Sequence, residues 1–338
     1  MKPSAPAVQM HTWKDLYAAT KAFSALQLWE VMDELDLVGV RDPLSGETGY
    51  GVVMGSGGTL FGFCVYRGAE GFGIYRRLIE GEADVEEEDL FAAQNCIKLE
   101  LGPQSDLQSE DLKVIRELGL SFKGKHAWPE FRSMLPGYAP WFLTESEARF
   151  LTLSLTAACH HAATVDDPET SVRVGGCVVY APAADGSKGF LAKWEPRPPR
   201  MQQPVEQPIL NLARINSIRT GKTRPDTSWE ADVFHLPSVI LDRERPYFIR
   251  VAALCQQSSG FALGVEPAAP ESSGLQILAD AICSAIEKHG FLPKTIFVKR
   301  AEYYAALTPL AKALGLTLRR RKNLTAVAML KRAMLSGI

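Results

Sequence analysis

The sequence predicts a two-domain protein in which an N-terminal α+β domain precedes a C-terminal α/β domain with a mixed sheet covered by helices. Short extended runs separated by glycine-rich turns follow an N-terminal helical pattern, which is typical of an antiparallel meander. After Gly274 the apolar residues change to helical spacing, and strands and helices then alternate. A chain of 338 residues also exceeds one ordinary core. We expect an N-terminal domain over 1–165, a hairpin and Pro-rich connecting region over 166–245, and a C-terminal domain over 246–338.

The N-terminal domain begins with apolar and aromatic residues at helical spacing from Trp13 to about Leu35. Three extended runs then follow at close intervals. They are Tyr50–Met54, Leu60–Tyr66 and Phe72–Leu78. Because glycine-rich turns separate them, we predict three antiparallel strands.

A further strand is expected at Gln94–Leu101 and a helix from Thr144 through Ala158. Ser171–Tyr180 and Phe190–Trp194 indicate a hairpin around Asp185-Gly186. The prolines of Glu195–Pro208 exclude a helix or a central strand, so this connector should be exposed. The stretch Asn211–Arg245 is irregular and predicts only one short strand, Ser238–Leu241.

The C-terminal domain opens with a hairpin formed by Tyr247–Leu254 and Phe261–Val265, joined by a turn that ends in Gly260. A helix over Leu275–Ile286 stops at His289-Gly290. The elements that follow are a strand (Thr295–Lys299), a helix (Glu302–Leu314), a strand (Leu316–Arg321) and a helix (Leu324–Leu335). This β-β-α-β-α-β-α order with short links predicts right-handed crossovers and a mixed sheet.

The order of elements in the C-terminal domain resembles a truncated RNase H-like core, the fold of transposase and integrase catalytic domains. In such enzymes, acidic residues on the first strand and after a later strand hold two metal ions for phosphodiester cleavage. Here the expected first strand, Val251–Cys255, has no acid, and Ile296–Arg300 ends in two cations. Glu266 and Asp280 remain, without acidic neighbours at the right positions. The resemblance therefore implies the fold without the catalytic acids.

A second resemblance covers most of the chain. It rests on motifs such as Trp13-x-x-Leu16-Tyr17, His126-Ala127-Trp128-Pro129 and Pro136-Gly137-Tyr138-Ala139-Pro140-Trp141. Together they resemble a family of bacterial conserved hypothetical proteins that pair this N-terminal domain with a C-terminal domain like Pro246–Ile338. The shared residues are mostly aromatic, glycine and proline, so the resemblance implies an architecture and no particular chemistry.

Composition describes an ordinary globular protein, with 46% hydrophobic and 22% charged residues. No apolar run approaches eighteen residues, and the N-terminus lacks an apolar signal core, so we expect a cytoplasmic protein. The charge is asymmetric: residues 1–150 carry 14 Lys and Arg against 23 Asp and Glu, whereas residues 245–338 carry 13 against 5. The basic end could meet an anionic partner or the acidic segment of its own chain.

The sequence contains no pattern that identifies a catalytic site, a cofactor or a metal. Gly57-Gly58-Thr59 lacks the lysine of a phosphate-binding loop, and no Gly-x-Ser-x-Gly elbow occurs. Cys159-His160-His161, followed by Asp166-Asp167, is the one cluster of soft and imidazole ligands. Consecutive helical residues point about 100° apart, so these side chains should not converge on one ion. His126, among aromatic residues, is the histidine that most invites inspection.

A possible anion-binding site is indicated by cations at the ends of two adjacent strands. Its residues are Lys299, Arg300, Arg319, Arg320, Arg321 and Lys322. Carboxyl ends of parallel strands meet at one edge of a sheet, where open α/β sheets bind ligands. Alternation along the strand should send Arg319 and Arg321 to one face and Arg320 and Lys322 to the other. The partner could be nucleic acid, bound weakly, or an acidic surface that includes Glu82–Asp89 of the same chain.

Two hypotheses from different classes follow. In the first, the chain is a non-catalytic binding or regulatory protein whose RNase H-like domain has lost its acids. In the second, it is a hydrolase-type enzyme with an inter-domain site made of dispersed residues. The first is favoured because the catalytic patterns fail at named positions, and a cleft of converging ionisable groups would favour the second.

Overall fold

The computed structural model describes residues 3–81, 87–164, 175–183, 189–200, 206–220, 223, 225 and 227–336. The chain divides into two compact units, each considered by itself. The N-terminal unit comprises Met1–Gly81, Ala93–Pro136 and Pro140–Met201. The C-terminal unit comprises Glu82–Ala92, Gly137–Ala139 and Gln202–Ile338. Two short segments from the first half of the sequence thus belong to the C-terminal unit.

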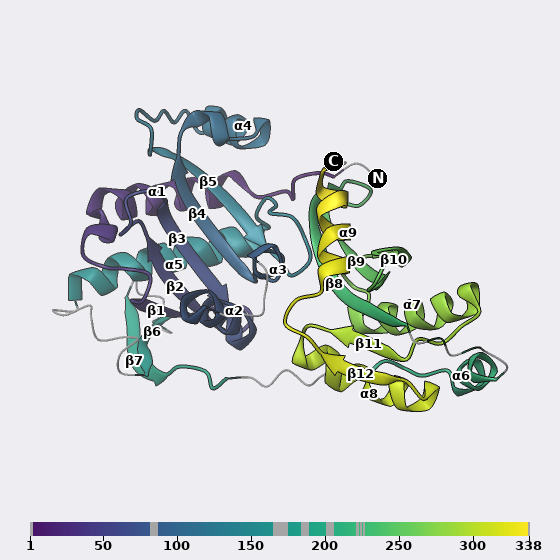
Figure 1. Cartoon of the computed structure of the whole chain (residues 1–338). Helices are drawn as coiled ribbons and strands as arrows, with labels where there is room; N and C mark the ends of the chain where they lie inside the picture. Colours follow the sequence, from purple (N-terminus) through teal and green to yellow (C-terminus); the bar gives the residue numbers. More distant parts are fainter. Residues whose placement is uncertain are drawn as a thin grey trace. The chain divides into compact units, whose positions relative to one another are not determined.

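The N-terminal unit is built on one seven-stranded sheet (Figure 1). Its strands are β1 (Leu37–Arg41), β2 (Thr48–Met54), β3 (Phe61–Arg67), β4 (Cys96–Gly102), β5 (Trp128–Met134), β6 (Gly176–Pro182) and β7 (Phe190–Pro196). The strand order is β5-β4-β3-β2-β1-β6-β7. Neighbours are antiparallel except for β1 and β6, which are parallel. The predicted hairpin of β6 and β7 therefore extends the same sheet.

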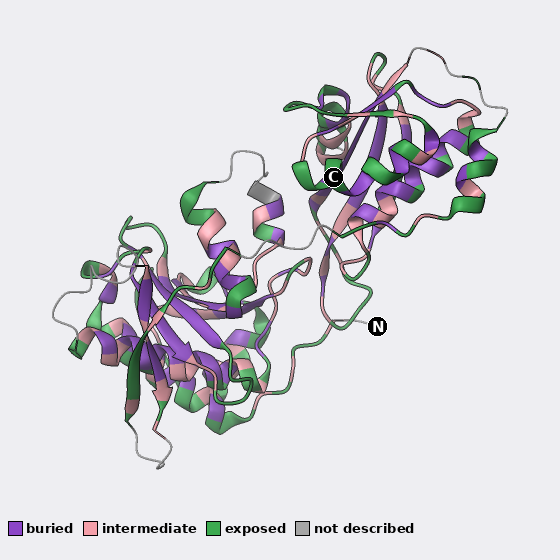
Figure 2. Cartoon of the chain, turned by 90° about the horizontal axis from the view of Figure 1, so that it is seen from below, coloured by how far each residue is buried: buried purple, intermediate pink, exposed green. Residues whose placement is uncertain are grey.

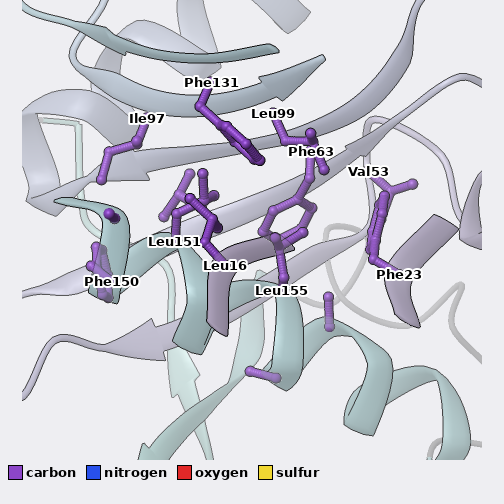
Figure 3. Packing of buried hydrophobic residues seen from close by; sticks show 14 of the residues in the cluster. Leu16, Phe23, Val53, Phe63, Ile97, Leu99, Phe131, Phe150, Leu151 and Leu155 are labelled. Atoms are coloured by element: carbon purple, nitrogen blue, oxygen red, sulfur yellow. The ribbon is translucent and has the colours of Figure 1, made fainter. Parts of the chain in front are cut away.

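Helices cover both faces of this sheet. They are α1 (Met10–Leu26), α2 (Gly68–Glu80), α4 (Ser109–Glu117) and α5 (Glu145–Thr164), with short 3-10 turns η1 (Leu28–Glu30) and η2 (Gln104–Asp106). Helices α1 and α5 pack on one face, where Leu16 and Leu151 meet Phe63 and Phe131 of the strands (Figure 3). Helix α2 packs on the other face through Phe72 and other residues. Burying large apolar side chains on both faces is what stabilises a central sheet.

Close strand contact explains one glycine in the meander. A Cβ at Gly62 on β3 would lie 2.1 Å from the carbonyl oxygen of Leu99 on β4. Any side chain there would force the strands apart, so glycine is required by the packing.

The prediction that Phe72–Leu78 is a third strand of the meander is wrong. These residues lie in α2, and β4 takes the place beside β3. Phe72 and Tyr75, three residues apart, are both buried against the sheet. That spacing suits a helix packed on the sheet, whereas the strand prediction rested on the close spacing of apolar runs between glycine-rich turns.

The C-terminal unit contains a mixed five-stranded sheet. Its strands are β8 (Ser228–Ile240), β9 (Tyr247–Gln256), β10 (Ala262–Ala268), β11 (Thr295–Val298) and β12 (Thr317–Arg320). The order is β10-β9-β8-β11-β12. Strand β9 pairs antiparallel with both β8 and β10, whereas β11 pairs parallel with both β8 and β12. The predicted α+β class with mixed sheets is confirmed.

Helices also cover both faces of the five-stranded sheet. They are α3 (Glu87–Ala92), α6 (Leu212–Arg219), α7 (Gly274–His289), α8 (Ala301–Leu314) and α9 (Thr325–Ser336). Helices α7 and α8 bury a core that includes Trp229 on one face, and α9 covers Phe234 and Val251 on the other. Strands β8, β9 and β11 are accordingly buried along most of their length, whereas the edge strands β10 and β12 are mostly exposed or half-buried (Figure 2).

The predicted β-β-α-β-α-β-α order misses one strand. Asn211–Arg245 is not irregular, because it contains α6 and the thirteen-residue strand β8, which lies in the centre of the sheet. Glu230 and Asp232 interrupt the apolar run of β8, which hid the strand in the sequence. Both carboxylates are buried in the folded unit.

The remaining C-terminal predictions are confirmed: the β9–β10 hairpin, followed by α7, β11, α8, β12 and α9, lies close to the expected ranges. The described part of the connector, which includes Arg197 and Arg200, is mostly exposed as predicted. Among the described residues, no helix is both long enough and apolar enough to cross a membrane.

Candidate anion-binding site

A pocket of about 450 Å³ lies in the C-terminal unit, where the ends of β11 and β12 meet α9. Its ionisable lining residues are Asp89, Asp232, Lys299, Arg300, Lys322, Lys331 and Arg332. Five cations thus face two carboxylates, which makes the pocket basic. Asn323 and Thr325 add polar groups, and Phe234, Leu324, Val327 and Leu335 form the apolar part. The location agrees with the preference of ligands for the carboxyl ends of parallel strands.

The pocket brings together three of the six predicted cations, namely Lys299, Arg300 and Lys322. Arg319, Arg320 and Arg321 are not among the residues that line it. The prediction that Lys322 shares a face with Arg320 is wrong. Strand β12 ends at Arg320, so Lys322 lies in the link to α9 and no longer follows the alternation of the strand.

Arg300 is held firmly by other residues of the C-terminal unit. Its Nη2 atom forms an ion pair with Oδ2 of Asp89, and its guanidinium lies 5.1 Å from the ring centroid of Tyr303. Only 14% of the Arg300 side chain is exposed. A buried cation of this kind needs a fixed partner, and Asp89 supplies it.

Asp89 also binds His235 on β8. Its Oδ1 atom accepts hydrogen bonds from the backbone nitrogen of His235, at 3.0 Å, and from Nδ1, at 2.8 Å. Burial raises the pKa of Asp89, but the His235 hydrogen bond and the Arg300 charge outweigh it and lower the pKa to about 2. Asp89 is therefore ionised at neutral pH and anchors α3 beside β8.

The pairing of Asp89 with Arg300 bears on the two partners considered for the basic end. The acidic segment Glu82–Asp89 does reach this end of the chain, at least through Asp89. The rest of that prediction concerns mainly residues 82–86, which lie outside the described residues. One of the predicted cations is thus already matched by a carboxylate of the same chain.

Asp232 lines the pocket, and only 9% of its surface is exposed. Burial raises its pKa to about 6, although the nearby charge of Arg300 and the backbone N–H of Val233 partly oppose the rise. The carboxylate of Asp89 acts in the same direction as burial. Asp232 therefore changes its charge in the mildly acidic range.

The other buried carboxylate of β8, Glu230, has a structural role. Its Oε2 atom accepts hydrogen bonds from the backbone nitrogens of Ala326, at 2.7 Å, and Val327, at 3.2 Å, at the start of α9. An anion at a helix N-terminus is favoured by the orphan N–H groups and the helix dipole. Arg321 lies 3.8 Å from Oε1 of Glu230 and over the ring of Phe297. Arg321 thus supports α9 instead of the pocket.

The sequence-based comparison with two-metal sites needs one correction. The central first strand of this sheet is β8, which carries Glu230 and Asp232, and not the acid-free Val251–Cys255 of β9. Lys299 and Arg300 directly follow β11, as expected, and both line the pocket. Among the described residues, no group of three His, Cys, Asp or Glu side chains could hold a metal ion.

The cluster at the end of α5 is explained by packing in the N-terminal unit. Nδ1 of the buried His161 lies 2.9 Å from the hydroxyl oxygen of Tyr180, and the His160 ring packs near Phe190. Burial and the neighbouring His160 lower the pKa of His161, which favours the neutral ring. Asp166 and Asp167 lie outside the described residues.

Two domains of unknown function match this chain. Residues 13–174 match the domain DUF7309, and residues 214–335 match DUF6930. No curated protein matches it. The two matches cover separate parts of the chain and, like the sequence itself, name no activity.

The chain is also similar to integrase structures. The HTLV-2 integrase catalytic core domain in complex with magnesium is 14% identical over 33% of this chain and 68% of its own, with a TM-score of 0.24. The BIV integrase catalytic core is 21% identical over 32% and 65%, with a TM-score of 0.24. A simian T-cell lymphotropic virus intasome in complex with the PP2A regulatory subunit B56 gamma is 18% identical over 36% and 43%, with a TM-score of 0.26.

Sequence reasoning missed three ionisable residues of the pocket, Asp232, Lys331 and Arg332, and it named Asp89 only as part of the acidic segment Glu82–Asp89. Lys331 and Arg332 lie in α9. They line the same pocket as Lys322 because α9 packs against β8 and β9. Two charged residues within an otherwise apolar helix could have drawn attention to them. Asp232 could have been found only by recognising β8 as a strand.

Proposed function

We propose that this protein is a non-catalytic binding protein whose C-terminal unit holds the phosphodiester backbone of a nucleic acid in the basic pocket. The observation that carries the proposal is the convergence of Lys299 and Lys322 with Lys331 and Arg332 from α9 around one pocket. Lysine and arginine side chains bind phosphate oxygens through charge and hydrogen bonds, without requiring a particular base sequence.

The C-terminal unit is proposed to be RNase H-like. At the end of β11, where a metal-binding carboxylate would be needed, it has the cations Lys299 and Arg300. Three antiparallel strands followed by two parallel strands support the topology. Arg300, at the end of β11, supports the non-catalytic assignment because its guanidinium is paired with Asp89 and near Asp232. A cation in this position opposes the binding of metal ions to the same two carboxylates.

Arg300 contributes mainly to the structure of the pocket, because Asp89 balances its charge. Five cations and two carboxylates line the pocket, so the net charge of its lining is positive and attracts anions at neutral pH. Binding without base contacts should be weak, and it should fall roughly tenfold or more between 50 and 200 mM salt.

The test compares two double variants that each remove two positive charges. Lys322→Gln with Arg332→Gln alters the pocket, whereas Arg319→Gln with Arg320→Gln alters exposed residues that do not line it. Fluorescence anisotropy with a labelled single-stranded oligonucleotide measures binding at 50 mM salt. We expect the pocket variant to bind at least about tenfold more weakly than the parent. The slope of log binding constant against log salt concentration should become shallower by about 1.4, since each lost phosphate contact contributes roughly 0.7.

The control variant should bind within about twofold to threefold of the parent, reflecting only the change in long-range charge. Equal losses in the two variants would refute a site in the pocket and indicate a diffuse electrostatic surface. If the parent protein does not bind the oligonucleotide at 50 mM salt, the nucleic-acid proposal is wrong.

A further inference from the structure

A larger pocket, of about 850 Å³, lies in the N-terminal unit and is separate from the basic pocket in both residues and chemistry. It is formed by the segment after α1, by the β2–β3 turn and by one residue before β5. Its lining residues are Gln27, Trp29, Glu30, Val31, Met32, Asp33, Asp36, Gly55, Ser56, Phe61 and His126. Among these described residues are three carboxylates and three aromatic rings, and none is lysine or arginine.

The aromatic rings form one continuous wall. The ring centroids of Trp29 and Phe61 are 5.2 Å apart, and those of Phe61 and His126 are 5.1 Å apart. Trp29 is supported from behind by the buried Phe23, at 6.0 Å. Ring faces carry partial negative charge and attract a cation placed near them.

Gly55 allows this wall to form. Its φ is +137°, and a Cβ there would lie 2.8 Å from Cβ of Trp29 and 2.8 Å from Cδ1 of Phe61. A larger residue would displace the rings or strain the turn. Oε1 of Glu34 accepts a hydrogen bond from the backbone nitrogen of Gly55, at 3.4 Å, and Oε2 accepts one from the Ser56 hydroxyl, at 2.6 Å. The two sides of the pocket are thereby joined.

The backbone on the opposite side is also specialised. Gln27 is the non-glycine residue with positive φ among the described residues, with φ 47° and ψ 47°. This left-handed residue ends α1 and starts the turn Leu28–Glu30, whose Leu28 is buried. The turn carries Trp29 and Glu30 to the pocket, and strained backbone of this kind persists where the surrounding structure holds it.

The carboxylates supply negative charge beside the aromatic wall. Glu30 and Asp33 are exposed, whereas Asp36 is only 8% exposed and accepts a hydrogen bond from the backbone nitrogen of Asp33 at 2.9 Å. A divalent metal does not suit this arrangement, because no set of three such ligands converges among the described residues. Carboxylates next to aromatic rings instead suit an organic cation, whose apolar part packs on the rings.

We propose that this pocket binds a small organic ammonium ion, with its apolar portion against Trp29 and Phe61 and its charge near Glu30 and Asp33. The class covers arylalkyl and alkyl amines in their protonated form. Neutral molecules of the same shape can use the aromatic wall alone and should bind more weakly. Anions should be excluded by the carboxylates.

The test uses phenethylammonium and its uncharged counterpart 2-phenylethanol, measured by isothermal titration calorimetry with the full chain at pH 7 and low salt. We expect the amine to bind at about millimolar Kd or tighter, and at least about tenfold more tightly than the alcohol. Glu30→Gln with Asp33→Asn should weaken amine binding about tenfold and leave alcohol binding unchanged, as expected for two lost charge interactions. Both residues are exposed, so folding should persist.

A matched control removes two exposed carboxylates of the same unit that do not line the pocket, Asp15→Asn with Glu117→Gln. It should bind the amine within about twofold of the parent. A second variant, Trp29→Phe, keeps an aromatic residue but reduces attraction to a cation, so it should weaken the amine severalfold more than the alcohol. Equal affinity for amine and alcohol, or equal losses in the pocket and control variants, would overturn the proposal. So would no binding of the amine at millimolar concentration.

Discussion

Replacing Asp89 with alanine should lower the free energy of unfolding of the C-terminal unit by about 3–5 kcal/mol, the range found when one partner of a buried ion pair is removed. The change leaves the guanidinium of Arg300 without its carboxylate and removes the acceptor of two His235 hydrogen bonds. Side chains of Asp89 and Arg300 are only 6% and 14% exposed, so water cannot fully replace the lost partner. Chemical denaturation of the full chain, followed by circular dichroism, measures the loss.

Two further variants separate charge from shape. Asp89→Asn keeps an oxygen acceptor for His235 but no charge for Arg300, so its loss should be smaller than that of the alanine variant. Combining Asp89→Ala with Arg300→Met removes both charges and should recover part of the stability, as a double-mutant cycle detects. A loss below about 1 kcal/mol in Asp89→Ala would contradict the view that this pair holds α3 on the C-terminal unit.

The same pair predicts a response to acid. Asp89 has a lower pKa in the folded unit, about 2, than the ordinary value of 3.8. Its contribution is therefore complete above about pH 4 and is lost as the pH falls toward 2. The Asp89→Ala variant has no carboxylate to protonate at this position. The difference in free energy of unfolding between parent and variant should therefore become smaller as the pH falls toward 2.

Replacing Asp232 with asparagine should have the opposite effect and stabilise the C-terminal unit by about 3 kcal/mol at pH 8. Folding raises the pKa of Asp232 from 3.8 to about 6, and each pKa unit corresponds to about 1.4 kcal/mol. Between these two values the folded unit binds a proton that the unfolded chain has released. Stability in the parent therefore falls as the pH rises from about 4 to 6.

Asparagine mimics the protonated acid and can still accept the hydrogen bond from the backbone nitrogen of Val233, at 2.9 Å in the parent. Chemical denaturation measures the free energy of unfolding of both proteins. The variant should exceed the parent by about 3 kcal/mol at pH 8 and by almost nothing at pH 4. The exposed Glu266 on β10 provides the control, because Glu266→Gln should change stability little at either pH. If Asp232→Asn is destabilising at pH 8, the carboxylate is needed as an anion beside Arg300.

The asparagine variant also tests the basic pocket. Removing the negative charge at position 232 leaves Asp89 as the one carboxylate among the residues that line the pocket, beside five cations. Oligonucleotide binding at pH 8 should therefore strengthen by a few fold, in contrast to the loss expected from Lys322→Gln with Arg332→Gln.

Local patterns in the sequence were sufficient for most of the C-terminal elements. Apolar residues at helical spacing followed by His289-Gly290 predicted α7, and the turn ending in Gly260 predicted the β9–β10 hairpin, because these signals depend only on near neighbours in the chain. Cations at the ends of β11 and β12 were likewise predictable from strand direction, which placed Lys299 and Lys322 at one edge.

Tertiary structure alone decided where the charged groups inside the sheet belong. Glu230 and Asp232 made β8 look irregular, since buried carboxylates are tolerated only with partners supplied from elsewhere. Those partners are the first turn of α9 for Glu230 and the charge of Arg300 for Asp232. Asp89 pairs with a residue 211 positions away, and no local pattern encodes such a contact. A non-local contact also explains the wrong strand prediction for Phe72–Leu78. The glycine-rich turns on either side do not show that β4 pairs with β3, which leaves these residues to form α2.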